Sequence, residues 1–238
     1  MKNLLIIDPQ NDFVDPHGSL FVPKSQEAIK EICRYIMINS HEIENIMMSL
    51  DSHHPWHISN SCYWKESPKL YTEITKELVT NETFNPLDEE SKPEILKGIE
   101  TNGPITIWPE HCIIGTWGHN IPSELYEVLR AWEIIKKKPV TIITKGTDHW
   151  FEAYSIFTKE TLYPFMSESI NDKIKMDMDL VICGFAKDIC VAETVKYMRT
   201  QEKYKNKLKF LEAGLAAINP KNCDIYQDCI ENFGATLI

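Results

Sequence analysis

The sequence predicts a single α/β domain, built on a doubly wound, six-stranded and mainly parallel sheet with helices on both faces. Short apolar runs alternate with amphipathic segments along the chain, and strands that are buried on both faces of a parallel sheet are apolar throughout. With 238 residues, of which 43% are hydrophobic, the chain is long enough for one large core. We therefore expect one domain over residues 1–238.

The strands and helices follow from this alternation. Uninterrupted apolar runs predict strands near 2–8, 44–51, 140–145, 179–184, 207–212 and 235–238. Between them, amphipathic segments predict helices near 24–40, 121–136, 188–202 and 220–233. Pro220 suits the first turn of the last helix, because its missing N–H would have no partner there in any case.

Residues 58–107 interrupt the pattern. This segment is polar, contains several prolines and shows only short helical patterns, near 69–78 and 91–100. A connection of this length between two core strands is unusual in a compact domain, so we expect a functional insertion or lid. Its aromatic residues Tyr63, Trp64 and Tyr71 would then cover a site or pack the insertion down.

Charged and nucleophilic residues stand where three of the predicted strands end. The first strand ends at Asp8 and the third at Lys145. After the fourth, Cys190 lies just inside the start of a helix, where the positive end of the helix dipole favours a thiolate. The carboxyl ends of parallel strands converge on one crevice. An acid, a base and a thiol that meet there predict a hydrolase.

A second polar group follows the second strand. Asp51, His53, His54 and His57 are close together in sequence, and His111 comes later. A carboxylate and imidazoles are ligand types for a divalent transition metal. We expect the Asp51–His53 pair to take part in such a site and His54 to be an ordinary surface residue. The two cysteines nearest in sequence, Cys62 and Cys112, lack the spacing of zinc fingers.

The composition limits the partners. A net charge of −10 and a pI near 5.3 argue against nucleic acid and anionic membrane surfaces, and no apolar run is long enough to cross a membrane. The first strand begins almost at the first residue, which leaves no room for a signal peptide. The seven cysteines form no CxxC pair and are odd in number. We therefore expect a cytoplasmic protein with reduced thiols.

Several motifs together resemble the nicotinamidase/pyrazinamidase branch of the isochorismatase-like cysteine hydrolase superfamily. The segment from Leu5 to Phe13 resembles the opening motif of that family. The later motifs follow in the family's order, with a metal region at 51–57 and 108–118, a lysine motif at 145–157 and a nucleophile motif at 184–191. One such motif is weak evidence, but five in order are specific.

The resemblance implies a catalytic triad of Asp8, Lys145 and Cys190. It also implies a cis peptide before Ala186, and an oxyanion hole formed by the N–H groups of Ala186 and Cys190. The other implied roles are substrate binding by the aromatic rings of Phe13 and Trp108, and binding of one metal ion, zinc or else iron or manganese, by Asp51, His53 and His111. His57 is either a further ligand or a supporting residue. Relatives commonly self-associate, so we expect a homo-oligomer.

The resemblance implies hydrolysis of nicotinamide to nicotinate and ammonia through a cysteine thioester. Three departures leave the substrate open, namely the altered sequence between Asp51 and Pro55, the bulky Ile156 near the expected pocket, and the long insertion. Two alternatives therefore remain. One is a cysteine hydrolase for another amide, ureido or N-carbamoyl compound, which would not need the metal residues. The other is a non-catalytic metal- or ligand-binding scaffold, which would not need an intact triad.

Overall fold

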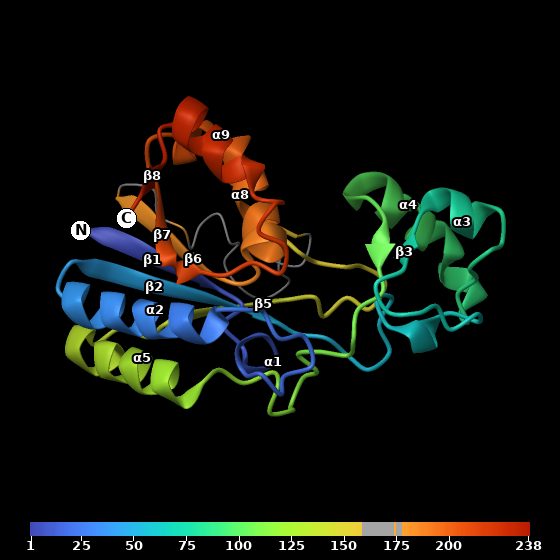
Figure 1. Ribbon diagram of the computed structural model, residues 1–238, viewed down its shortest axis with the longest axis horizontal. Coiled ribbons are helices and arrows are strands. Elements are labelled where there is room, and N and C mark those ends of the chain that lie inside the picture. Colours follow the sequence, from blue (N-terminus) through green and yellow to red (C-terminus); the bar gives the residue numbers. More distant parts are fainter. Residues whose placement is uncertain (159–173, 175–177) are drawn as a thin grey trace.

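The computed structural model of the protein describes residues 1–158, 174 and 178–238, and its centre is a six-stranded sheet (Figure 1). The strand order is β5-β2-β1-β6-β7-β8, and every neighbouring pair is parallel. The predicted sheet is therefore confirmed. Its strands are β1 (Lys2–Ile7), β2 (Ile43–Asp51), β5 (Thr141–Lys145), β6 (Asp179–Gly184), β7 (Leu208–Leu215) and β8 (Thr236–Leu237).

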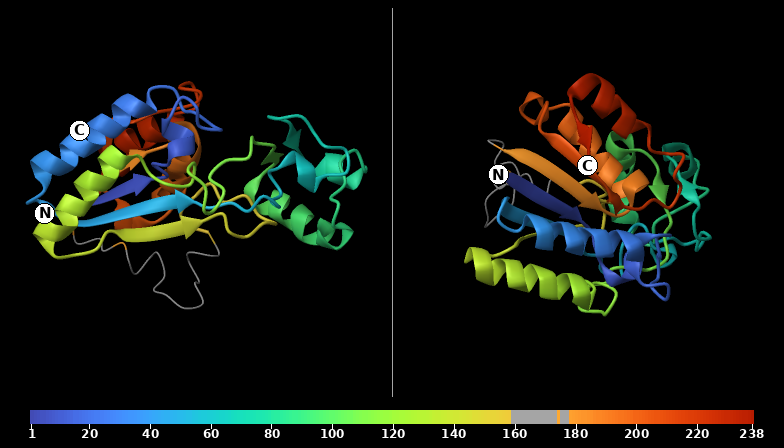
Figure 2. Two further views of the ribbon diagram at one scale, coloured as in Figure 1. Left: turned by 90° about the horizontal axis from the view of Figure 1, so that it is seen from below. Right: turned by 60° about the vertical axis from the view of Figure 1, so that its left-hand side comes forward.

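Helices cover both faces of the sheet (Figures 1 and 2). Leu4 and Ile6 of β1 share a hydrophobic cluster with α2 (Ser25–Asn39) and α5 (Ser123–Lys136). Leu5 and Ile7 belong to the opposite cluster, with α8 (Ala192–Arg199) and α9 (Asp224–Phe233). Successive side chains of a strand point to opposite faces, which is why this apolar run is buried on both sides. A short helix, α1 (Asn11–Val14), follows β1.

Two predicted helix starts are corrected. The helix expected from 188 begins as a π-helical turn, Lys187–Val191, which leads into α8. The prediction for Pro220 was wrong, because α9 begins only at Asp224. The chain before α9 is held instead by Asp188, whose carboxylate accepts hydrogen bonds from the N–H groups of Ile218 (2.9 Å) and Asn219 (2.6 Å).

The insertion forms a small unit beyond the carboxyl ends of the strands (Figure 2). It contains β3 (Glu73–Ile74), α3 (Lys76–Thr80), α4 (Lys92–Asn102) and β4 (Ile105–Thr106). The helix expected at 69–78 was wrong, since Ile74 pairs with Ile105 in a two-stranded sheet and Thr75 caps the start of α3. The helix expected at 91–100 is confirmed as α4. A hydrophobic cluster that includes Tyr63 and Trp64 gives the insertion its own core.

Gly184 ends β6 at a point where no side chain fits. Its φ is +114°, and a Cβ would lie 2.1 Å from the carbonyl oxygen of Ile7. We expect Gly184→Ala to lower the free energy of unfolding by at least about 3 kcal/mol, measured by urea denaturation. The control is Gly98→Ala in α4, where a Cβ would meet only Phe151, at 4.0 Å. That change should be neutral or slightly stabilising. Equal stability of the two variants would contradict this expectation.

Among the described residues, no helix combines the length and the apolar character needed to cross a membrane.

Candidate active site

The parallel register brings the predicted strand-end residues to one edge of the sheet. Asp51 pairs with Lys145 across β2 and β5, and Ile7, the residue before Asp8, pairs with Gly184 across β1 and β6. Cys190 follows β6 after a short turn. Three strands and one helical turn therefore supply one site, as the sequence predicted.

Lys145 is the centre of this site. Its side chain is fully buried, and its Nζ lies 2.9 Å from Asp8 Oδ2 and 2.9 Å from Asp51 Oδ1. The same ammonium donates to the carbonyl oxygen of Ala153 (2.9 Å) and lies 3.7 Å from Cys190 Sγ. Burial alone would lower the pKa of Lys145, but Asp51 and Asp8 outweigh it and raise the pKa well above its ordinary value. A permanent positive charge therefore joins the expected triad to the expected metal site.

Cys190 is a buried thiol in a protein cavity, with 7% of its surface exposed. Burial raises its pKa well above that of a free cysteine, and the nearby Lys145 lowers it only in part. The expectation that helix position would favour a resting thiolate is therefore corrected. Desolvation outweighs the dipole of a helical segment that starts with an irregular turn. A neighbouring base has to remove the proton when the thiol reacts.

Asp8 is the base nearest to this thiol. Its carboxyl group is fully buried, and burial raises its pKa although Lys145 lowers it. The residue has a φ of +47°, a conformation that aspartate tolerates better than most residues. Ser49 on β2 contacts it twice, since the Ser49 hydroxyl donates to Asp8 Oδ1 (2.6 Å) and accepts from the Asp8 N–H (3.1 Å). Sequence reasoning had not singled out Ser49, which is simply one more small residue in a strand.

Asp51, His53 and His111 form the one group of potential metal ligands found in the described part of the chain, and all three are buried. His53 Nε2 and His111 Nε2 lie 3.1 Å and 3.3 Å from Asp51 Oδ2. The other ring nitrogens, both Nδ1, contact the carbonyl oxygens of Gly146 and Pro109, at 3.2 Å and 2.8 Å. A carbonyl only accepts, so each Nδ1 carries a proton, and each Nε2 is the ring nitrogen that faces Asp51 and could bind a metal ion.

His53 is the member of this group whose charge the neighbours change most clearly. Burial lowers its pKa, but the Asp51 carboxylate outweighs burial and raises the pKa to about 9. Without a metal ion, His53 is therefore positively charged at neutral pH, with its second proton on Nε2, the nitrogen that a metal ion would bind. A bound metal would displace that proton.

His57 lies beside the metal group and is arranged differently. Its Nδ1 accepts from the N–H of Ser59 (3.3 Å), so this nitrogen is unprotonated and Nε2 carries the hydrogen. Burial lowers the pKa of His57 well below the ordinary value, which keeps the ring neutral. The ring packs against His53 at 4.3 Å between centroids. This geometry indicates a supporting residue. The predicted surface residue, His54, is exposed.

The two cysteines near this group do not join it. Cys112 is buried in the main core, and Cys62 is exposed on the insertion. All seven cysteines of the chain are free.

A small pocket lies directly beside Cys190. Phe13 and Trp108, the residues expected to bind the substrate, both line it, and Ala186 and the potential metal ligands Asp51 and His111 form part of its wall. Five further residues had not been expected to line the pocket, although Glu152, Tyr154 and Ile189 lie within the lysine and nucleophile motifs. The five are Leu20, Glu152, Tyr154, Ile189 and Ile218.

Two residues expected near the pocket have other positions. Ile156 is fully buried in the core on the α8 and α9 side and does not line the pocket, so its bulk does not narrow the site. Tyr71 of the insertion is exposed, and its ring meets Trp108 edge-on at 5.9 Å between centroids. The insertion therefore supports a pocket wall through Tyr71, while Tyr63 and Trp64 are packed inside it.

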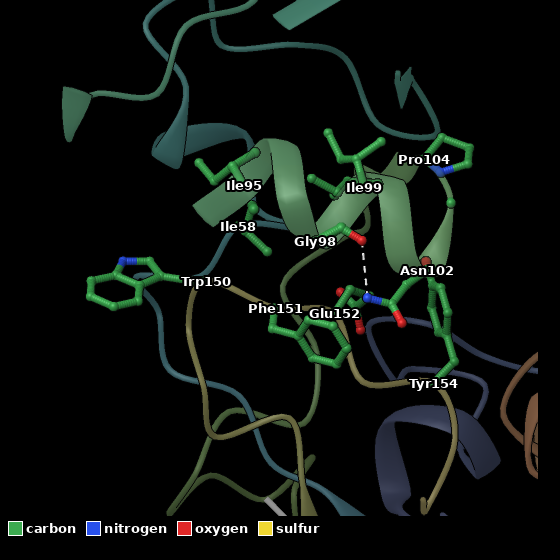
Figure 3. A pocket seen from close by; sticks show the side chains of 12 residues that line it. Ile58, Ile95, Gly98, Ile99, Asn102, Pro104, Trp150, Phe151, Glu152 and Tyr154 are labelled. Atoms are coloured by element: carbon green, nitrogen blue, oxygen red, sulfur yellow. Dashed lines mark hydrogen bonds between the residues drawn. The ribbon is translucent and has the colours of Figure 1, made fainter. Parts of the chain in front are cut away.

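Glu152 and Tyr154 also line a second small pocket, on the side of the insertion (Figure 3). Isoleucines of the insertion, including Ile95 and Ile99 of α4, form its opposite wall. The Glu152 side chain is only 7% exposed, and its Oε2 accepts no hydrogen bond from any described residue. One carboxylate thus separates the insertion from the pocket beside Cys190.

The peptide bond between Phe185 and Ala186 is cis, as the resemblance implied. The Ala186 N–H, which borders the pocket, donates to no group of the described residues.

Comparison with known proteins gives a consistent result, although no protein-family model matches the chain. A nicotinamidase of Saccharomyces cerevisiae is 28% identical over 198 residues, which covers 82% of this chain and 79% of the relative. A nicotinamidase of Schizosaccharomyces pombe is 25% identical over 201 residues, covering 82% and 76%.

Solved structures share the fold. The yeast nicotinamidase Pnc1p bound to nicotinaldehyde superimposes with a TM-score of 0.69 at 23% identity, over 100% of this chain and 99% of that chain. The pyrazinamidase of Pyrococcus horikoshii, in complex with zinc, gives 0.59 at 20% identity, over 100% and 98%.

The parallel sheet brings a cysteine, a lysine and an aspartate to its carboxyl edge, and the chain shares its fold with nicotinamidases and a pyrazinamidase of known structure. In sequence the chain is similar to nicotinamidases.

Proposed function

We propose that this protein is a metal-dependent nicotinamidase, which hydrolyses nicotinamide to nicotinate and ammonia through a thioester on Cys190. The observation that carries this proposal is the position of Lys145. Its ammonium contacts Asp8 and Asp51 and lies 3.7 Å from Cys190 Sγ. Both named sequence relatives are nicotinamidases.

The triad performs proton transfer and nucleophilic attack. Asp8 takes the proton of Cys190, and Lys145 stabilises the negative charge of the buried pair. The thiolate attacks the amide carbon, and the N–H groups of Ala186 and Cys190 stabilise the oxyanion of the tetrahedral intermediate. Protonated Asp8 then donates to the leaving ammonia. Water, deprotonated by Asp8, cleaves the thioester and releases the acid.

The pocket holds the ring. Phe13 and Trp108 provide aromatic surface for a pyridine. The Trp108 ring is fixed by a hydrogen bond from its Nε1 to the Tyr154 hydroxyl (3.1 Å) and by the edge contact with Tyr71. In this proposal the insertion acts as a partial lid, which supports Trp108 from outside.

The residues present fit a divalent transition metal. Two imidazole Nε2 atoms and a carboxylate oxygen lie close together, and the unpartnered Oε2 of Glu152 is available for water beside them. Asp51, His53 and His111 would hold the ion, with zinc first and iron or manganese as alternatives. Such an ion would supply Lewis acidity with which to orient the ring nitrogen of the substrate.

The same observations disfavour the two alternatives. A cysteine hydrolase for ureido or N-carbamoyl compounds has no use for the buried Asp51, His53 and His111. A non-catalytic scaffold has no need to bury Asp8, Lys145 and Cys190 in contact with one another.

We also propose a cytoplasmic location, a homo-oligomeric state, and the absence of nucleic-acid and membrane partners. The seven free cysteines suit a reducing compartment. The net charge of −10 disfavours polyanions.

Ammonia release from nicotinamide by the purified protein tests the function. We expect activity that Cys190→Ala abolishes and that a strong chelator removes until zinc is restored. Cys183→Ala is the matched control, because Cys183 is equally buried but lies in the sheet, away from the pocket. It should retain activity. A metal-replete protein that releases no ammonia from nicotinamide or pyrazinamide would refute the assignment.

A further inference from the structure

We propose that Ser49 is a positioning residue for the base, and that it fixes Asp8 Oδ2 as the oxygen that receives the Cys190 proton. The inference rests on the proposed function, since it assigns Asp8 the role of base. Ser49 lies on β2, whereas Asp8 follows β1, so the contact joins two neighbouring strands at the edge where the site forms.

Ser49 holds both the backbone and the side chain of Asp8. The Asp8 N–H donates to Ser49 Oγ at 3.1 Å, and Ser49 Oγ donates to Asp8 Oδ1 at 2.6 Å. Ser49 and Asp8 are both fully buried, so water cannot replace either bond. Asp8 adopts a φ of +47°, which few residues other than glycine populate, and the residue after it is Pro9. A double contact with a fixed strand stabilises that conformation.

The hydrogen bond also distinguishes the two carboxylate oxygens. Oδ1 already accepts the Ser49 proton, whereas Oδ2 faces Lys145 Nζ at 2.9 Å. The same Nζ lies 3.7 Å from Cys190 Sγ, so Oδ2 and the thiol share one ammonium neighbour, whereas Oδ1 is bound by Ser49. The proton therefore passes from Sγ to Oδ2, and the S–H electron pair stays on sulfur as the thiolate. Oδ2 then gives this proton to the nitrogen that leaves as ammonia. Ser49 keeps its own proton throughout.

A matching contact holds the metal side of the site. Gln10 Oε1 accepts from the Asp51 N–H (2.7 Å), and Gln10 Nε2 donates to the Asp51 carbonyl oxygen (2.7 Å). Ser49 of β2 thus holds a residue that follows β1, and Gln10, which follows β1, holds a residue of β2. The two residues act on different functional groups, because Ser49 positions the proton acceptor and Gln10 positions the metal ligand.

The test compares Ser49→Ala with Ser49→Thr. We expect Ser49→Ala to lower kcat for nicotinamide about 10- to 100-fold, as for a misplaced catalytic group, with KM and bound zinc unchanged. Alkylation of Cys190 by iodoacetamide, a readout that needs no substrate, should slow in the same variant. Ser49→Thr keeps the hydroxyl on a strand residue and should restore both rates.

Ser91→Ala is the matched control. Ser91 is also a buried serine with two hydrogen bonds, to Tyr63 and Asp88, but it lies in the insertion. It should lose stability while keeping both rates. Wild-type alkylation and kcat in Ser49→Ala would overturn the proposal, as would a loss that Ser49→Thr does not restore. If the wild-type protein does not hydrolyse nicotinamide, the proposed function fails, and the alkylation series still decides the role of Ser49.

Discussion

Lys145→Met is expected to lower the free energy of unfolding by about 3–5 kcal/mol and to abolish activity, because it leaves two buried carboxylates without their shared counter-charge. Asp8 and Asp51 each lie 2.9 Å from Lys145 Nζ, and all three side chains are almost completely buried. Urea denaturation at neutral pH measures the loss. Lys138→Met is the control, since its ion pair with Glu44 is partly exposed to water and its loss should leave the stability almost unchanged.

A second substitution separates charge from packing. In Lys145→Met, Asp51 still has His53 beside it, whereas Asp8 has lost its positive partner. Adding Asp8→Asn removes this unpaired charge, so the double variant should be more stable than Lys145→Met alone. It should remain inactive, because it has neither the lysine nor the base. A double variant less stable than the single one would show that the lysine contributes through packing and not through its charge.

The pH dependence of the loss follows from Asp8. Burial raises the pKa of this carboxyl, and Lys145 lowers it in part. Because Lys145→Met removes the lysine, the pKa of Asp8 should be still higher in the variant. A carboxyl with a higher pKa in the folded than in the unfolded protein takes up a proton on folding, so its penalty exists at neutral pH and disappears on acidification. The stability difference between Lys145→Met and the wild type should therefore shrink as the pH falls towards about 4. A difference that grows on acidification would contradict the argument.

The sequence predicted the sheet well because its strands carry strong local signals. Leu4 to Ile7 are apolar without interruption, and burial on both faces is the one arrangement that suits such a run. Once the strands were assigned, the positions of Asp8, Asp51 and Lys145 followed from topology alone. Parallel strands present their carboxyl ends at the same edge.

The errors came from contacts between distant segments. Pro220 suits a helix start locally, but the loop after it is held by Asp188, some thirty positions away. The pKa of Cys190 depends on burial by elements that local sequence does not reveal. Ser49 and Ile218 reach the site only through the fold. Their residue types are common, and no motif marks them. Short-range patterns therefore predicted the elements and the reactive groups, but not the residues that position them.

Removal of His111 is expected to have the largest effect on the metal. Its Nε2 lone pair lies 3.3 Å from Asp51 Oδ2, and the Nδ1 proton is held by Pro109, so the ring is oriented for binding before the metal arrives. We expect His111→Ala to weaken zinc binding by more than about 100-fold, since it removes a direct ligand and not only a supporting contact. Zinc competition with a chromophoric chelator measures the affinity.

His57→Ala and His54→Ala complete the series. The His57 ring packs against His53, and its unprotonated Nδ1 is already occupied by the Ser59 N–H. His57→Ala should therefore weaken zinc binding only about 10- to 100-fold. His54 is exposed, and its replacement should change nothing. In the wild-type protein, zinc binding should weaken as the pH falls below about 9, because a proton competes for His53 Nε2. If His57→Ala weakens zinc binding as much as His111→Ala does, His57 is instead a direct ligand. Its ring would then have to give up the hydrogen bond from the Ser59 N–H to bind the metal.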